Sequence, residues 1–118
     1  RKALDNFYKR DDTLSLGVCN GCQLMIELGL ITPTDDVKPK MDHNVSHKFE
    51  SNFVGVTIPQ NDSVMFGPLS GMKLGIWVAH GEGRFVMPRP VSDYNVVLKY
   101  SYAAYPGNPN GSRALWPA

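Results

Sequence analysis

The sequence predicts an α/β fold in which a mixed sheet is flanked by helices. A short apolar run at residues 14–18 leads through a glycine-rich turn into a stretch with helical periodicity. A second apolar run, at residues 74–79, has the length expected of a buried strand. Hydrophobic residues make up 42% of the 118 residues, which is enough for a packed core in one domain and argues against disorder.

Two helices and one strand are predicted in the first part of the chain. The first helix covers residues 2–9, because its apolar side chains fall on one side: Leu4, Phe7 and Tyr8. Residues 13–18 form the strand. The second helix, over residues 20–29, ends at Gly29, a C-cap signal, with Pro33 beyond it. Its apolar positions recur at helical spacing: Leu24, Met25, Leu28 and Leu30.

The rest of the chain is predicted to hold mainly strands and turns. Residues 31–44 are polar and contain prolines, so they form a connection. Residues 48–58 carry enough apolar and aromatic positions for one or two strands, which Pro59 ends. Residues 74–79 and 95–100 are further strands. Residues 105–112 consist almost wholly of turn-forming residues.

Charge and cysteine content exclude several classes of protein. Twelve basic and eleven acidic residues give a formal net charge of +1, and the longest basic element, Lys38-Pro39-Lys40, is too small to bind nucleic acid. We find neither a signal peptide nor the roughly 20 consecutive apolar residues of a membrane span. The two cysteines fit a reducing compartment better than a disulfide scaffold. We therefore expect a cytoplasmic protein that binds neither nucleic acid nor membrane.

Residues 13–23 have the order of strand, sharp turn and helix that is typical of a nucleophile elbow. In this motif the nucleophile lies on a strained turn that crowds the backbone around it. Glycines stand two residues before and after Cys19, at Gly17 and Gly21, where we expect a Cβ to clash. Cys19 would lie at a helix N-terminus, where free N–H groups and the helix dipole favour a thiolate. The alternative is a buried cysteine in an ordinary strand–helix connection.

Two polar residues close to Cys19 could bind a substrate. In a nucleophile elbow, the residue after the nucleophile supplies one oxyanion-hole donor, and this residue is Asn20. Gln23 lies about one helical turn after Cys19, and its side chain can both donate to and accept from a bound amide or amino acid. The alternative for Gln23 is an ordinary position on the helix surface.

The segment 79–83, Ala-His-Gly-Glu-Gly, follows directly on the second apolar run. In extended chain, His80 and Glu82 point the same way, so they could serve Cys19 as a base and the carboxylate that orients it. This pattern is typical of a cysteine hydrolase or peptidase. In the alternative interpretation, the glycines permit a close backbone approach and His80 only satisfies neighbouring groups.

The cysteines also permit a metal or redox site. Cys19 and Cys22, followed after 20 residues by His43 and His47, imitate the ligand order of a zinc finger, so a zinc-binding interaction module is one alternative. The same Cys-x-x-Cys spacing occurs in redox pairs of the thioredoxin type. We favour neither, because the gap exceeds the roughly 12–15 residues of the zinc pattern and holds an apolar helix. Cys22 fits better as a small buried apolar residue.

Three segments taken together resemble one family. They are Gly-Val-Cys-Asn-Gly-Cys-Gln at residues 17–23, Val-Ala-His-Gly-Glu-Gly-Arg-Phe at 78–85 and Tyr-Pro-Gly-Asn-Pro-Asn-Gly-Ser at 105–112. The elbow alone resembles the class I glutamine amidotransferases in general. With the other segments in this order, nearly the whole chain resembles the glutaminase domain of the phosphoribosylformylglycinamidine synthase family, although Lys48 and Asn52 stand where the family has arginines.

The resemblance implies a carbon–nitrogen ligase that takes its nitrogen from glutamine. Cys19 corresponds to the nucleophile that attacks the side-chain amide of L-glutamine, giving a γ-glutamyl thioester and ammonia. Asn20 corresponds to the oxyanion-hole position and Gln23 to a glutamine-binding one. The amino-acid part of the substrate would be held by backbone groups at the strand end: Ala79, His80, Gly81 and Glu82.

The resemblance also implies a partner and its cofactors. Ammonia would pass to an ATP-dependent synthetase domain of the same enzyme, which converts formylglycinamide ribonucleotide to an amidine in de novo purine biosynthesis. ATP and magnesium belong to that synthetase portion. The glutaminase domain itself is expected to need neither a metal nor an organic cofactor.

Finally, the resemblance sets expectations for the fold and the extent of the chain. Family members have a flavodoxin-like mixed sheet, whose first strand and glycine loop would precede Arg1. Their catalytic histidine and glutamate lie in a His-Pro-Glu element, which this sequence lacks. We therefore expect residues 1–118 to be the central part of one glutaminase domain, incomplete at both ends, with residues 113–118 departing from the family pattern. His80 and Glu82 would then line the substrate pocket, and the piece alone would lack glutaminase activity.

Overall fold

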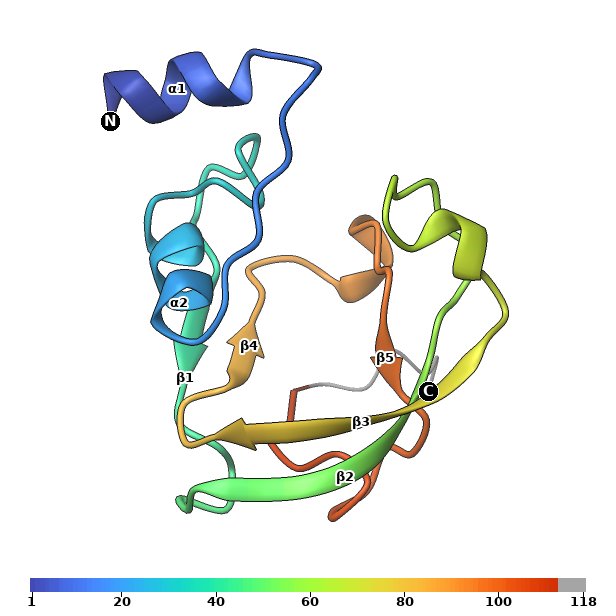
Figure 1. Ribbon diagram of the computed structural model, residues 1–118. Helices are drawn as coiled ribbons and strands as arrows, with labels where there is room; N and C mark the ends of the chain where they lie inside the picture. Colours follow the sequence, from blue (N-terminus) through green and yellow to red (C-terminus); the bar gives the residue numbers. More distant parts are fainter. Residues whose placement is uncertain (113–118) are drawn as a thin grey trace.

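The computed structural model describes residues 1–112, which form two antiparallel sheets and two α-helices (Figure 1). The helices are α1 (Lys2–Tyr8) and α2 (Asn20–Glu27). One sheet pairs β1 (Lys40–Asp42) with β4 (Arg84–Val86). The other has the order β3-β2-β5, with β2 (Glu50–Thr57), β3 (Lys73–His80) and β5 (Lys99–Tyr100). Short 3₁₀ turns lie at Gly67–Leu69 and Val91–Asp93. Neither helix of these residues has the length and apolar character needed to cross a membrane.

The end of α2 confirms the predicted C-cap. Gly29 has a φ of +66°, a left-handed conformation that glycine adopts without steric cost. The Gly29 N–H donates to the Ile26 carbonyl at 3.0 Å and the Leu30 N–H to the Met25 carbonyl at 3.0 Å, which is the Schellman pattern. The buried side chain of α2 is Ile26, which the predicted apolar face omitted, whereas Leu24 is 54% exposed.

The inner face of β2 provides most of the core. Successive strand residues face opposite sides, so Val54 and Val56 share one face, and Ile58 lies just beyond the strand. All three are at most 4% exposed. β3 pairs with β2 along the whole strand, with Glu50 opposite His80. In Figure 1 the two strands form one long curved pair, and β5 adds to β2 only near its end.

The structure corrects two predictions about strands. β3 is not a buried strand, because its residues alternate between exposed and half-buried, and Trp77 remains 79% exposed beside Phe53. The predicted mixed sheet is not found within residues 1–112, where every strand pairing is antiparallel. The α/β composition is confirmed, and the flavodoxin-like arrangement stays a prediction.

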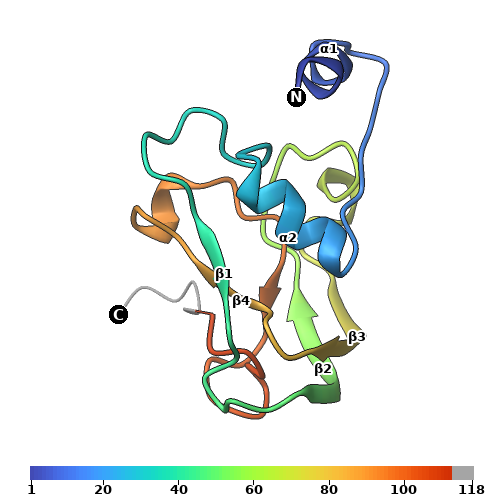
Figure 2. The same ribbon diagram turned by 90° about the vertical axis from the view of Figure 1, so that its left-hand side faces the viewer.

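Residues 13–18 are not the hydrogen-bonded strand that their apolar pattern predicts. The segment pairs with no strand of the described chain, and its apolar side chains are 68–75% exposed: Leu14, Leu16 and Val18. Figures 1 and 2 show this segment leading from α1, which stands apart from the sheets, to the start of α2. The Arg1 guanidinium donates to the Leu28 carbonyl and links α1 to the end of α2.

Several other predicted segments agree with the structure in part. The helix over 2–9, the strand within 48–58 and the turns over 105–112 are confirmed. Of the strand predicted over 95–100, only the two residues of β5 are strand in the structure. The prediction for residues 113–118 lies outside the described residues.

β1 was missed because it lies in the polar segment 31–44, which we predicted to be a connection. An ion pair joins it to β4: Arg84 Nη2 lies 3.0 Å from Asp42 Oδ2, and the two residues are directly opposite in register. The His43 N–H also donates to Asp42 Oδ1 at 2.8 Å. This backbone hydrogen bond, together with the charge of Arg84, lowers the pKa of Asp42 below its ordinary value of 3.8.

We predict that Asp42→Asn reduces the acid dependence of stability. Because folding lowers the pKa of Asp42, its carboxylate stabilises the fold above the unfolded-state pKa, and this stabilisation is lost as the pH falls through the folded-state pKa. The variant should therefore be less stable near neutral pH and lose less stability below about pH 4. Urea unfolding across this range measures the effect. If the free energy of unfolding falls with decreasing pH as steeply in the variant as in the unmodified chain, the prediction is wrong.

We also predict that Ile58→Ala destabilises the fold by about 2–5 kcal/mol, because Ile58 is 0% exposed and its loss leaves a cavity. Val64 is 78% exposed, so Val64→Ala is the matched control and should change the free energy of unfolding by less than about 0.5 kcal/mol. Urea unfolding of both variants provides the comparison. If both variants lose the same free energy of unfolding, Ile58 is not a core residue.

Candidate active site

The turn at Cys19 has the geometry of a nucleophile elbow. Cys19 has a φ of 56° and a ψ of −122°, a combination that residues with a side chain rarely adopt. The Gly21 N–H donates to the Val18 carbonyl at 2.9 Å and the Cys22 N–H to the Cys19 carbonyl at 3.0 Å, so the extended chain turns directly into α2. The Cys19 thiol is free and exposed. The alternative of a buried cysteine is therefore wrong.

The N-terminus of α2 lies beside this thiol. Cys19 is the N-cap, and its side chain makes no capping hydrogen bond to the helix. The N–H groups that follow donate to the carbonyls of Val18 and Cys19. The Asn20 N–H has no acceptor within residues 1–112. An N–H donor and the positive end of a helix dipole are therefore available next to the sulfur.

Gly17 and Gly21 differ in how closely they are packed. A Cβ at Gly17 would overlap Met25 Sδ and lie 2.9 Å from the Gly21 carbonyl oxygen, which confirms the predicted clash. A Cβ at Gly21 would meet nothing within 4 Å, so the clash predicted there is wrong. Only the glycine before the cysteine is required by packing.

Glu82 connects the turn after β3 to the start of α2. Its Oε2 lies 3.5 Å from Gln23 Nε2, and its Oε1 lies 3.7 Å from His43 Nδ1. These residues come from the turn between β3 and β4, from α2 and from the position just after β1, segments that are distant in the sequence (Figure 1). The structure thus brings together Gln23 and Glu82, two residues that the sequence singled out separately.

His80 does not pair with Glu82. Its Nδ1 lies 3.0 Å from Oδ1 of Asn44, and its Nε2 is buried without a hydrogen-bond partner among the described residues. The cysteine-hydrolase alternative needs Glu82 to orient His80, but the Glu82 carboxylate lies near Gln23 and His43 instead. Asn44 was missed because it lies in a polar connection with no periodic pattern.

The zinc alternative lacks a ligand cluster. Within the part of the chain that the structure describes, no group of three His, Cys, Asp or Glu side chains could hold a metal ion. The four residues that the sequence suggested all belong to that part: Cys19, Cys22, His43 and His47. Burial raises the pKa of the Cys22 thiol, so Cys22 ionises less readily than an ordinary cysteine. The exposed thiol is that of Cys19.

We predict opposite effects for the two elbow glycines. Gly17→Ala should destabilise the chain by about 1–3 kcal/mol, because its Cβ collides with a backbone carbonyl as well as with a side chain. Gly21→Ala should be neutral or stabilising by up to about 1 kcal/mol, because alanine favours the helix and meets open space. Urea unfolding of both variants tests this, and the reverse order would contradict the packing of the elbow.

The chain is similar in sequence to proteins of a known family. Residues 1–115 match the family described as the CobB/CobQ-like glutamine amidotransferase domain. A protein of Arabidopsis thaliana is named probable phosphoribosylformylglycinamidine synthase, chloroplastic/mitochondrial. It is 43% identical over an alignment 124 residues long, and this alignment covers 90% of this chain and 9% of the relative. A Drosophila melanogaster protein named phosphoribosylformylglycinamidine synthase is 41% identical over 123 residues, with the same coverage of each chain.

A third relative, from Dictyostelium discoideum, also has the name phosphoribosylformylglycinamidine synthase. It is 46% identical over 88 residues, which cover 71% of this chain and 6% of the relative. The chain therefore spans no more than 9% of the length of these relatives. The similarity confirms the resemblance found in the sequence. The chain belongs to the CobB/CobQ-like glutamine amidotransferase domain family.

Proposed function

We propose that this chain supplies the nucleophile and part of the glutamine pocket of a glutaminase domain in a phosphoribosylformylglycinamidine synthase. The observation that supports this most strongly is the exposed thiol of Cys19, which lies on a strained turn at the start of α2. The family and the names of the relatives support glutamine as the substrate class.

In the proposed reaction, the thiolate of Cys19 attacks the side-chain carbonyl carbon of L-glutamine. Negative charge develops on the carbonyl oxygen, where the Asn20 N–H and the dipole of α2 stabilise it. The carbon–nitrogen bond then breaks, the nitrogen takes up a proton, and ammonia leaves. Water hydrolyses the remaining γ-glutamyl thioester, which releases glutamate and restores the thiol.

Gln23 and Glu82 form the other part of the proposed pocket. L-Glutamine has an α-ammonium group and an α-carboxylate that remain unchanged in the reaction. The Glu82 carboxylate can pair with the ammonium group, and the Gln23 amide can donate to or accept from the substrate. We assign the remaining contacts to backbone groups of residues 79–82. The distance of 3.5 Å between the Gln23 and Glu82 side chains supports one shared pocket.

The ammonia has a defined use in this proposal. A synthetase portion of the same enzyme, with ATP and magnesium, converts formylglycinamide ribonucleotide to its amidine in purine biosynthesis. The length of the relatives supports this division, because more than nine tenths of each lies outside the matched region.

We predict that a glutamine-analogue electrophile of the diazo-norleucine type modifies Cys19 in the complete protein that carries this chain. Cys19→Ser should prevent the modification and lower glutaminase activity by at least about a thousandfold, because it removes the nucleophile. Peptide mass spectrometry locates the label, and a glutaminase assay measures the activity.

Cys22→Ser is the matched control. Cys22 is half-buried and its thiol has a raised pKa, so this variant should keep both the labelling at Cys19 and the activity. Labelling of Cys22 in place of Cys19, or full activity in Cys19→Ser, would overturn the proposed function.

A further inference from the structure

Asn44 is fully buried, and its hydrogen bonds hold the turn that carries Glu82. Its Nδ2 donates to the His80 carbonyl at 2.7 Å and to the Lys48 carbonyl at 2.8 Å. Its Oδ1 accepts from His80 Nδ1 at 3.0 Å and from the Gly83 N–H at 3.4 Å. Its backbone N–H donates to the Gly81 carbonyl at 2.9 Å. One residue therefore binds the turn at both of its ends and in its middle.

These contacts fix the tautomer of His80. The backbone carbonyls of Lys48 and His80 can only accept hydrogen bonds, so the Asn44 atom that faces them must be the amide nitrogen. The atom that faces the imidazole is then the amide oxygen, which also only accepts. His80 Nδ1 must therefore carry the proton. The remaining nitrogen, Nε2, is buried and has no partner among the described residues.

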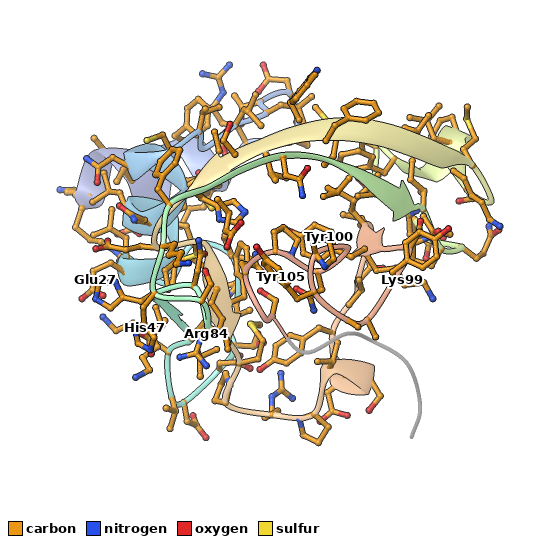
Figure 3. The ribbon with its side chains drawn as sticks, turned by 90° about the horizontal axis from the view of Figure 1, so that it is seen from below. Glu27, His47, Arg84, Lys99, Tyr100 and Tyr105 are labelled. Atoms are coloured by element: carbon orange, nitrogen blue, oxygen red, sulfur yellow. The ribbon has the colours of Figure 1, made fainter. Side chains whose placement is uncertain are left out.

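The backbone of Gly83 holds the imidazole in place. A Cβ on Gly83 would lie 2.7 Å from His80 Cγ and 2.9 Å from His80 Nδ1, so the ring packs directly against a position where only glycine fits. The Gly83 carbonyl accepts from Nδ2 of Asn110 at 2.7 Å, and this nitrogen also lies 3.2 Å from the Tyr100 hydroxyl. Figure 3 shows Tyr100 and Tyr105, near Asn110 in the sequence, on the inner side of the curved β2–β3 pair.

We propose that Asn44 is a positioning residue of the candidate site. It fixes His80 as the Nδ1–H tautomer and holds the peptide groups of residues 80–83, and through them it determines where Glu82 meets Gln23. For its effect on glutamine this inference rests on the proposed function. Asn44 touches none of the reacting atoms in that proposal, so its loss should weaken substrate binding more than it slows the chemical step.

The first test is the tautomer of His80, which requires no enzymatic activity. Imidazole ¹⁵N spectra of the full chain, with the His80 signals assigned from their loss in His80→Gln, should show the proton on Nδ1. In Asn44→Ala, the proton of the His80 imidazole should no longer be confined to Nδ1. An Nε2–H tautomer in the unmodified protein overturns the proposal, whether or not the variant folds.

Asn61→Ala is the matched control. Asn61 is also buried, at 7% exposure, but it donates to the Pro59 carbonyl and accepts from the Ser63 N–H in a different loop. This variant loses a buried asparagine without touching residues 80–83, so the tautomer of His80 should not change. If both variants abolish the Nδ1–H state, the effect is general and the proposal fails.

The second test is the kinetics of glutamine hydrolysis in the complete protein. Asn44→Ala should raise KM by about tenfold or more and change kcat by less than about threefold, whereas Asn61→Ala should leave KM unchanged. A loss confined to kcat, or an equal rise of KM in both variants, overturns the positioning role. If the unmodified protein hydrolyses no glutamine, the proposed function fails, and the tautomer experiment still decides whether Asn44 fixes His80.

Discussion

Cys19 has a backbone conformation that costs a residue with a side chain about 1–3 kcal/mol, and the candidate site depends on it. This conformation lets the chain pass from an extended segment into α2 within one residue, so the thiol projects into solvent at the helix N-terminus. Gly17 packs against the backbone of this turn and leaves it little room to relax. The same geometry leaves the Asn20 N–H without an acceptor within residues 1–112, next to the sulfur.

The side of the candidate site that carries Glu82, away from Cys19 in the sequence, depends on buried polar groups rather than on apolar packing. The buried isoleucine and valine side chains of the described residues are few: Ile26, Val54, Val56 and Ile58. The turn after β3 is held by the amides of Asn44 and Asn110. A buried polar group that loses its partner costs more free energy than a satisfied hydrogen bond contributes, so such a network tolerates few substitutions. Glu82 is therefore positioned by residues that lie far from it in the sequence.

Short sequence patterns correctly predicted those features that depend only on neighbouring residues in the chain. Gly29 ended α2 as expected, and the glycine-rich turn at Cys19 marked the elbow, because both depend on backbone conformations of neighbouring residues. The apolar runs at 14–18 and 74–79 were misjudged, since the burial of a strand depends on what pairs beside it. Asn44 could not be predicted at all, because the role of a buried amide depends on carbonyls and a ring supplied by distant segments.

The proposed reaction requires the sulfur of Cys19 to open the side-chain amide of glutamine through a covalent thioester. Rapid acid quenching of the complete protein during turnover of glutamine, followed by mass spectrometry that distinguishes the two cysteines, would detect this thioester. We expect one γ-glutamyl group on Cys19 and none on Cys22. A γ-glutamyl group found on Cys22, or on any other residue of the chain in place of Cys19, would contradict this reaction.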